Sequence, residues 1–276
     1  MFKNYLKIAW RNFINGKLYS FINLSGLTIG MTSFILIALF VQYEISYDKQ
    51  HEYVDDIYRV ISEQPGNEYK GTDLFSGTPF PLGTAMVEDF PEVKAKTGID
   101  LRKNLLSTDE EAFNEKGVFA DKGFFDVFTV KLISGEGKSA LVEPSNILLT
   151  ESLAKKLFGN QAPLNQNVTF NRGTQFTVKG VIADPPKNQH FNYSYIASVD
   201  DAPYYSANEK AWGNNSAVTY VRLASGTDFK QLESKLLVYQ KKSEEEYEKY
   251  GLEPPIYRLQ PLKDIEWVFP ENGILS

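Results

Sequence analysis

The feature that most constrains this chain is a run of 26 residues without a formal charge, from Leu18 to Tyr43. Roughly 20 helical residues cross the hydrocarbon core of a bilayer, so the run is long enough and has residues to spare for tilt. Its densest part, 34–41, is almost purely apolar. The run therefore predicts a transmembrane helix over residues 18–43 rather than a buried helix of a soluble domain.

The charges on either side of the run predict its orientation. No acid occurs before Glu44, and four bases precede the run, namely Lys3, Lys7, Arg11 and Lys17. Because cytoplasmic flanks carry the excess of Lys and Arg, we expect the N-terminus to lie in the cytoplasm, with the helix in the inner (cytoplasmic) membrane. A cleaved signal peptide is the alternative, but its apolar stretch is shorter and ends at a small-x-small site, and no Ala-x-Ala pattern follows Val41.

Residues 1–16 predict a basic amphipathic helix on the cytoplasmic side. Apolar residues recur at steps of three and four, and Lys3, Lys7 and Arg11 recur at steps of four beside them. With Trp10 on the apolar face, such a helix is expected to lie along the inner headgroup layer, with its cations near anionic lipid. A straight continuation of the transmembrane helix into water is the alternative.

Small residues within the run predict a helix-packing face. Gly26, Gly30 and Ser33 lie on neighbouring turns, and the two glycines form a Gly-x-x-x-Gly. In lipid, where helix association depends on close packing, such residues let a second helix approach. We therefore expect the transmembrane helix to have a helix partner.

Residues 44–276 predict an α+β domain, because strands alternate there with helices. With the N-terminus in the cytoplasm, this domain is expected to be extracytoplasmic. Of the 29 bases, four precede residue 44 and 25 remain against all 35 acids, a formal charge of −10. This charge excludes nucleic-acid binding as a main function, since a phosphate backbone needs basic contacts. The chain has no cysteine, which excludes disulfides, thiol nucleophiles and cysteine-ligated metals.

Local signals predict individual elements of this domain. The turn 123–128 is expected to bury its three phenylalanines, and Asp184 with two prolines is expected to end the strand before it. We expect strands at 57–62, 118–120, 147–149, 176–182 and 218–223. We expect helices near 46–55, over 78–89 with Thr78 as N-cap, over 151–158 between Thr150 and Gly159, and from Asp228 to about Tyr250.

Nothing in the sequence builds an active site. Gly-x-Ser-x-Gly, Walker A and His-Glu-x-x-His motifs are all absent. His51 and His190 lack ligand spacing, and His190 is interpreted as a surface or turn residue. Asp55 and Asp56 are adjacent and are not expected to converge as an acid-base pair. We therefore expect no catalytic, cofactor-binding or metal-binding residues.

Seven stretches, taken in order, resemble one family. They are YLKIAWRN at 5–12, NLSGLTIG at 23–30, EISYDK at 44–49, IYRV at 57–60, FFDVF at 124–128, LLTESLAKKLFG at 148–159 and GVIADPP at 180–186. Together they resemble the FtsX-like permeases that carry a MacB-type periplasmic core domain, over nearly the whole chain. The outer domain is therefore expected to have the fold of that core domain.

The resemblance implies the membrane subunit of an ABC transporter, working as a homodimer with a separate cytoplasmic ABC ATPase. ATP-driven motion then passes along the helices to the outer domains, where a peptide, antibiotic or lipoprotein is exported or released, with an outer-membrane or periplasmic partner. Family permeases carry three further membrane helices after this domain. This chain is therefore expected to be the N-terminal part of a longer protein, or a truncated product.

Two other classes of function stay open. One is a membrane-tethered sensor or adhesion module whose outer domain binds a ligand, which a following kinase domain or stop codon without an adjacent ATPase gene would favour. The other is an anchored enzyme, because a fold can hide a site that one sequence does not display. Silence of the outer part against hydrolase substrates would count against the enzyme.

Overall fold

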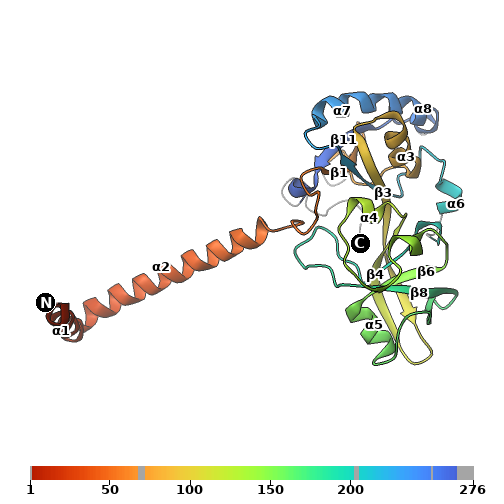
Figure 1. Ribbon diagram of the computed structural model, residues 1–276. Helices are drawn as coiled ribbons and strands as arrows, with labels where there is room; N and C mark the ends of the chain where they lie inside the picture. Colours follow the sequence, from red (N-terminus) through yellow and green to blue (C-terminus); the bar gives the residue numbers. More distant parts are fainter. Residues whose placement is uncertain (1, 68–71, 202–204, 250, 266–276) are drawn as a thin grey trace. The chain divides into compact units, whose positions relative to one another are not determined.

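The computed structural model describes residues 2–67, 72–201, 205–249 and 251–265. The chain divides into two compact units, residues 1–47 and 48–276, and we call the second unit the core domain. The first unit holds two helices, α1 (Phe2–Asn15) and α2 (Lys17–Glu44). Both are drawn in red and orange in Figure 1.

Helix α2 has the length and composition of a membrane span. Among the described residues it is the one helix long and apolar enough to cross a bilayer, and none of its side chains is buried. At Gly16 the backbone leaves helical geometry, with φ −93° and ψ 49°. The predicted amphipathic helix is therefore a separate helix, α1, and not a straight continuation of α2.

The core domain has the mixed α+β architecture that the sequence predicts. Its described residues form an eleven-stranded sheet in the order β11-β1-β10-β3-β4-β9-β6-β8-β5, with β2 beside β1 and β7 beside β3 and β8. Two neighbouring pairs, β4–β9 and β6–β8, are parallel. The strands are β1 (Ile57–Glu63), β2 (Leu74–Phe75), β3 (Val93–Ser107), β4 (Ala112–Ala120), β5 (Leu132–Gly135), β6 (Asn146–Thr150), β7 (Asn167–Phe170), β8 (Thr174–Ile182), β9 (Tyr195–Ser198), β10 (Val218–Leu223) and β11 (Ile256–Pro261).

The longer helices of the core domain gather at its two ends. Helices α3, α7 and α8 lie at one end and α5 lies at the other, with the long strands β3 and β4 running between them (Figure 1). Short 3₁₀ turns join several elements. The helices are α3 (Phe80–Asp89), α4 (Phe124–Val127), α5 (Glu151–Phe158), α6 (Tyr205–Asn208), α7 (Phe229–Lys235) and α8 (Gln240–Glu248).

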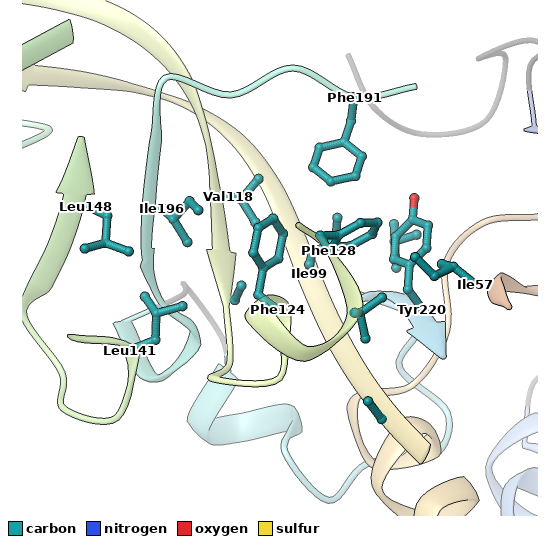
Figure 2. Packing of buried hydrophobic residues seen from close by; sticks show 14 of the residues in the cluster. Ile57, Ile99, Val118, Phe124, Phe128, Leu141, Leu148, Phe191, Ile196 and Tyr220 are labelled. Atoms are coloured by element: carbon teal, nitrogen blue, oxygen red, sulfur yellow. The ribbon is translucent and has the colours of Figure 1, made fainter. Parts of the chain in front are cut away.

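Three clusters of buried side chains hold this arrangement together. One packs α3 and α7 on the β1, β10 and β11 end of the sheet, and one packs α5 on β6 and β8. The third joins α4 to the middle strands through Phe124, Phe128 and Tyr220 (Figure 2). Each fully buried large apolar side chain stabilises the fold by about 1.5–3 kcal/mol, so these clusters define which face of each strand is inside.

Local predictions are confirmed where the sequence marks both the start and the stop of an element. Thr150 caps α5, because its hydroxyl accepts the N–H of Leu153, and Gly159 ends the helix with a positive φ of 58°. Asp228 caps α7 by accepting the N–H groups of two following residues. The five predicted strands all lie within observed strands.

Four local predictions are wrong. Residues 46–55 are not a helix but a series of turns with hydrogen bonds between residues three apart. The N-cap of α3 is Pro79, because the Thr78 hydroxyl is engaged elsewhere, with Ala217 and Thr219 of the strand region. The predicted helix from Asp228 to about Tyr250 is interrupted by a 3₁₀ turn at Leu236–Tyr239. Of the three phenylalanines in the turn 123–128, which were all expected to be buried, Phe125 is only half-buried.

Candidate functional site

The predicted membrane-interface residues all lie on α1. Lys3, Lys7, Trp10 and Arg11 are exposed, and the Trp10 ring stacks on Phe13 with 6.1 Å between centroids. The helix therefore offers an aromatic pair and three cations to its surroundings. Their contact with lipid stays a prediction.

The predicted helix-packing residues lie on α2 and are also exposed. A Cβ atom added at Gly26 or Gly30 would meet nothing within 4 Å, and Ser33 lies one turn further along. The space directly outside these two glycines is therefore open. Helix pairing on this face stays a prediction.

A buried polar network that the sequence did not reveal holds the first residue of the core domain, Asp48. Its side chain is 1% exposed, and its φ of +56° is a left-handed conformation that Asp tolerates better than most residues. The Asp48 N–H donates to the Asn188 carbonyl at 3.0 Å, and Oδ1 lies 2.9 Å from Nδ1 of His190. On the other side of that ring, Nε2 lies 2.8 Å from the hydroxyl of Tyr220 on β10. We call Asp48, His51, His190 and Tyr220 the junction network.

The geometry defines a proton arrangement for the neutral form of His190. Its Nδ1–H donates to the Asp48 carboxylate, and its Nε2 accepts the Tyr220 hydroxyl proton. Hydrogen bonds to an ionised group are shorter and stronger than those between neutral groups. The pair of bonds therefore ties the chain at Asp48 to a strand in the middle of the sheet.

His51 closes the network from a second side. Its Nε2 lies 3.9 Å from Oδ1 of Asp48, and its Nδ1 accepts the N–H of Thr129 at 3.1 Å. Because Nδ1 accepts a hydrogen bond, the neutral ring carries its proton on Nε2, which lies 3.3 Å from the Gln50 side-chain amide and beyond hydrogen-bond distance from the carboxylate. Burial lowers the pKa of His51 to about 4, against the opposite influence of Asp48 and with a smaller lowering by His190. His51 is therefore neutral at pH 7.

Aromatic rings enclose the network. The Phe128 ring lies 5.1 Å from that of His51 and 5.0 Å from that of Tyr220, measured between centroids. Phe191 lies 4.6 Å from the His190 ring. Phe128, Phe191 and Tyr220 are seen together in Figure 2. This enclosure removes water from the hydrogen bonds, which strengthens them and fixes their geometry.

Two stretches that carry the family resemblance, and the loop that follows a third, converge on this network. The stretch 44–49 supplies Asp48, the stretch 124–128 supplies Phe128, and the loop after the paired prolines supplies His190. One oxygen, Oδ2 of Asp48, is buried and accepts no hydrogen bond from any described residue. The described residues therefore leave one acceptor atom of this carboxylate unsatisfied.

The junction network is suited to fixing the chain and not to group transfer. Its Asp–His–hydroxyl chain resembles the relay of a catalytic triad, but His190 is 7% exposed and Tyr220 is 2% exposed. A substrate cannot reach either side chain. Within the described ranges, no group of three or more His, Cys, Asp or Glu side chains is arranged to hold a metal ion. What the arrangement can do is hold Asp48 in one place in the core domain.

The interpretation of His190 as a surface or turn residue is right about the turn, since the residue lies in a bend of the chain, but wrong about the surface. It lies in a loop, as predicted from Asp184 and the prolines, but its ring points into the aromatic cluster and is buried. Its partner Asp48 is 142 residues away in the chain. Phe191 follows His190 directly and Tyr193 lies two residues further on. These two aromatic side chains were a local indication that the loop packs against the core.

Comparisons with known proteins agree with this architecture. The MacB-like periplasmic core domain family matches residues 20–237. Among solved structures, a domain of a putative permease protein from Porphyromonas gingivalis is 26% identical, with a TM-score of 0.67, and the match covers 83% of this chain and 95% of that one. Comparison with the curated proteins gives no match.

Two more distant structures share the fold. The periplasmic region of MacB from Actinobacillus actinomycetemcomitans is 15% identical, with a TM-score of 0.54 and coverage of 80% of this chain and 94% of that one. The extracellular domain of the noncanonic ABC-type transporter YknZ from Gram-positive bacteria is 13% identical, with a TM-score of 0.50 and coverage of 74% and 99%. Since the family match spans most of the chain, this protein belongs to the MacB-like periplasmic core domain family.

Proposed function

We propose that this chain carries ATP-driven motion from the membrane to the periplasmic core domain, for export or release of a peptide, an antibiotic or a lipoprotein. A separate cytoplasmic ABC ATPase hydrolyses the ATP. The subunit works as a homodimer in the inner membrane, with its N-terminus in the cytoplasm. An outer-membrane or periplasmic partner engages the core domain.

The observation that carries this proposal is the junction network. Asp48 follows the last residue of α2 by four positions and is hydrogen-bonded to the loop at Asn188 and His190. Through His190 it is bonded to Tyr220 in the sheet. Protein interiors are packed at crystal-like density, so a displacement at Asp48 is passed to the sheet. A flexible linker at this position would absorb the same displacement.

The features of the membrane unit support the same role. Gly26, Gly30 and Ser33 suit close packing of a second helix, which a moving bundle needs and a simple tether does not. The cations of α1 and Trp10 suit the inner headgroup layer, where they would hold the start of the chain in the plane of the membrane.

The test measures whether ATP moves the core domain through this network. The chain has no cysteine, so Asp109→Cys, on the β3–β4 hairpin, gives a single site for a spin label. Electron paramagnetic resonance then measures the distance between labels in the dimeric permease purified with its ATPase, with and without ATP and vanadate. We expect a shift with ATP in the otherwise unchanged protein.

Two variants of the labelled protein distinguish loss of transmitted motion from a nonspecific effect of substitution on the fold. Asp48→Ala with His190→Ala removes the hydrogen bonds of the junction network. This double variant is expected to abolish the ATP-dependent shift in the distance between labels while ATP hydrolysis continues. Ser152→Ala, which removes a hydrogen bond to Asp184 at the start of α5, is the control and keeps the shift. An unchanged shift in the double variant, or none in the parent, contradicts the proposal.

A further inference from the structure

An open groove of about 540 Å³ lies beside the terminal strand of the sheet, β11. The side chains lining it come from β1, from the start of β2, from α7, and from β11 and the turn that follows it. Ile61, Leu74 and Phe229 give it an apolar surface. We call it the β11 groove.

Both cations of the β11 groove are already paired. The Arg258 Nε donates to the Glu63 carboxylate at 2.7 Å, and the Lys230 ammonium lies 3.1 Å from Glu233. Glu233 also accepts the N–H of Leu259 at 3.0 Å. That bond takes up one backbone N–H of β11, the terminal strand of the sheet.

Two further carboxylates of the β11 groove have no cation partner among the described residues. The side chains of Asp73 and Asp264 line it, and neither forms an ion pair or hydrogen bond with a described residue. Both are partly exposed. The groove therefore has an excess of negative charge that favours a cationic occupant, and this electrostatic complementarity gives a partner specificity as well as attraction.

The floor of the β11 groove also carries an amide donor without an acceptor. Gln260 is 4% exposed, and its Oε1 accepts two hydrogen bonds from Arg59, at 3.1 and 2.7 Å. These bonds fix the orientation of the amide, and no described residue accepts from its Nε2. Strand pairing places Gln260 on the same face of the sheet as Arg258 and Ile61, which line the groove. A carbonyl oxygen is the acceptor that this donor lacks.

We propose that the β11 groove binds a basic, extended peptide segment of a partner protein. A Lys or Arg side chain of the segment faces Asp73 and Asp264, a backbone carbonyl accepts from Nε2 of Gln260, and an aliphatic side chain packs on Ile61 and Leu74. A basic peptide offers a cation, an amide carbonyl and an aliphatic group together. The inference does not depend on the ATP-driven relay, because binding needs no ATPase.

The test uses the full chain in detergent micelles and the fluorescein-labelled peptide acetyl-Leu-Arg-Leu-Ala-amide. Fluorescence anisotropy gives its dissociation constant and that of a twin with Glu in place of Arg. We expect the basic peptide to bind at least about tenfold more tightly. Asp73→Asn with Asp264→Asn should weaken its binding about three- to tenfold, since each exposed ion pair contributes up to about 1 kcal/mol. Asp109→Asn with Glu110→Gln makes the same charge change on the β3–β4 hairpin and should leave binding unchanged.

A second arm tests the amide and the location. Gln260→Glu keeps the acceptor for Arg59 and removes the donor, so it should weaken binding of an uncharged peptide in which Ala replaces Arg. A benzophenone group on the basic peptide should crosslink to β1, β2, β11 or α7, as mapped by mass spectrometry. Equal affinities for the basic and acidic peptides, equal effects of the two double variants, or crosslinks confined to other elements would overturn the proposal.

Discussion

Acidification is expected to destabilise the core domain through His51. The imidazole is 7% exposed and neutral, because burial lowers its pKa to about 4. In the unfolded chain the same group has its ordinary pKa of about 6.5. Between these two values the unfolded chain binds a proton that the folded chain does not. The free energy of unfolding therefore falls as the pH drops from about 6.5 to about 4.

The size of this effect follows from the two pKa values. A difference of one in pKa corresponds to 1.36 kcal/mol, so the gap amounts to about 3 kcal/mol for this one group. The free energy of unfolding changes with pH in the opposite direction to that expected for a histidine held charged by a carboxylate, although Asp48 lies 3.9 Å away. Burial outweighs that attraction. A loss of about 3 kcal/mol is a large share of the stability of a typical domain.

The matched substitution is His51→Asn. The Oδ1 of asparagine can replace Nδ1 as acceptor for the Thr129 N–H, and the side chain does not titrate. Pulse proteolysis in urea, on the full chain in detergent micelles, measures the free energy of unfolding of the core domain at pH 7 and pH 4. The parent is expected to lose about 3 kcal/mol more than the variant over this range. Carboxylates protonated in both proteins cancel in the comparison, so an equal loss in the two would refute the reasoning.

Three further predictions concern other parts of the chain. Tyr220→Phe removes the donor to His190 and should lower the free energy of unfolding by about 1–3 kcal/mol in the same assay, whereas no change would show that this hydrogen bond is unimportant. Gly180→Ala places a Cβ against the backbone carbonyl of Glu136, so β8 must shift and stability should fall by about 1–3 kcal/mol; a silent substitution would contradict this packing. Gly30→Cys introduces the chain's only thiol and should give a disulfide-linked dimer on oxidation in membranes, and monomer alone would count against the packing face.

The sequence predicts those elements whose ends are set by neighbouring residues. Helix α5 is an example, because the Thr150 cap, the late lysines and Gly159 all act within one or two turns. The long apolar helix α2 is another, since length and the absence of charge alone distinguish it. Such signals are local, and they do not depend on which strands pair.

The strand that organises the sheet, β3, was missed for the opposite reason. Its 15 residues, Val93–Ser107, include lysines and arginine on a half-exposed face, and buried and exposed positions alternate imperfectly. It becomes a strand because β10, β4 and β7 all pair with it. Long-range pairing of this kind overrides weak local preference.

The junction network was beyond local reasoning as well. Asp48 and His190 are 142 residues apart, and His190 and Tyr220 are 30 apart. The residues around Asp48 have helical patterning, but α2 ends at Glu44 and a series of turns follows it, in which Asp48 has a left-handed backbone conformation. The resemblance indicated that the stretch 44–49 matters, and the fold gives the physical reason.

The central claim is that the hydrogen bonds of the junction network hold Asp48 firmly in the core domain. Hydrogen exchange at this network tests the claim most directly. The Asp48 amide donates to Asn188 at 3.0 Å, and the Thr129 amide donates to His51 at 3.1 Å. If the junction network holds Asp48 firmly, both amides, measured at single-residue resolution in the full chain, exchange as slowly as those of β10. Exchange as fast as that of the exposed hairpin tip at 108–111 would contradict it.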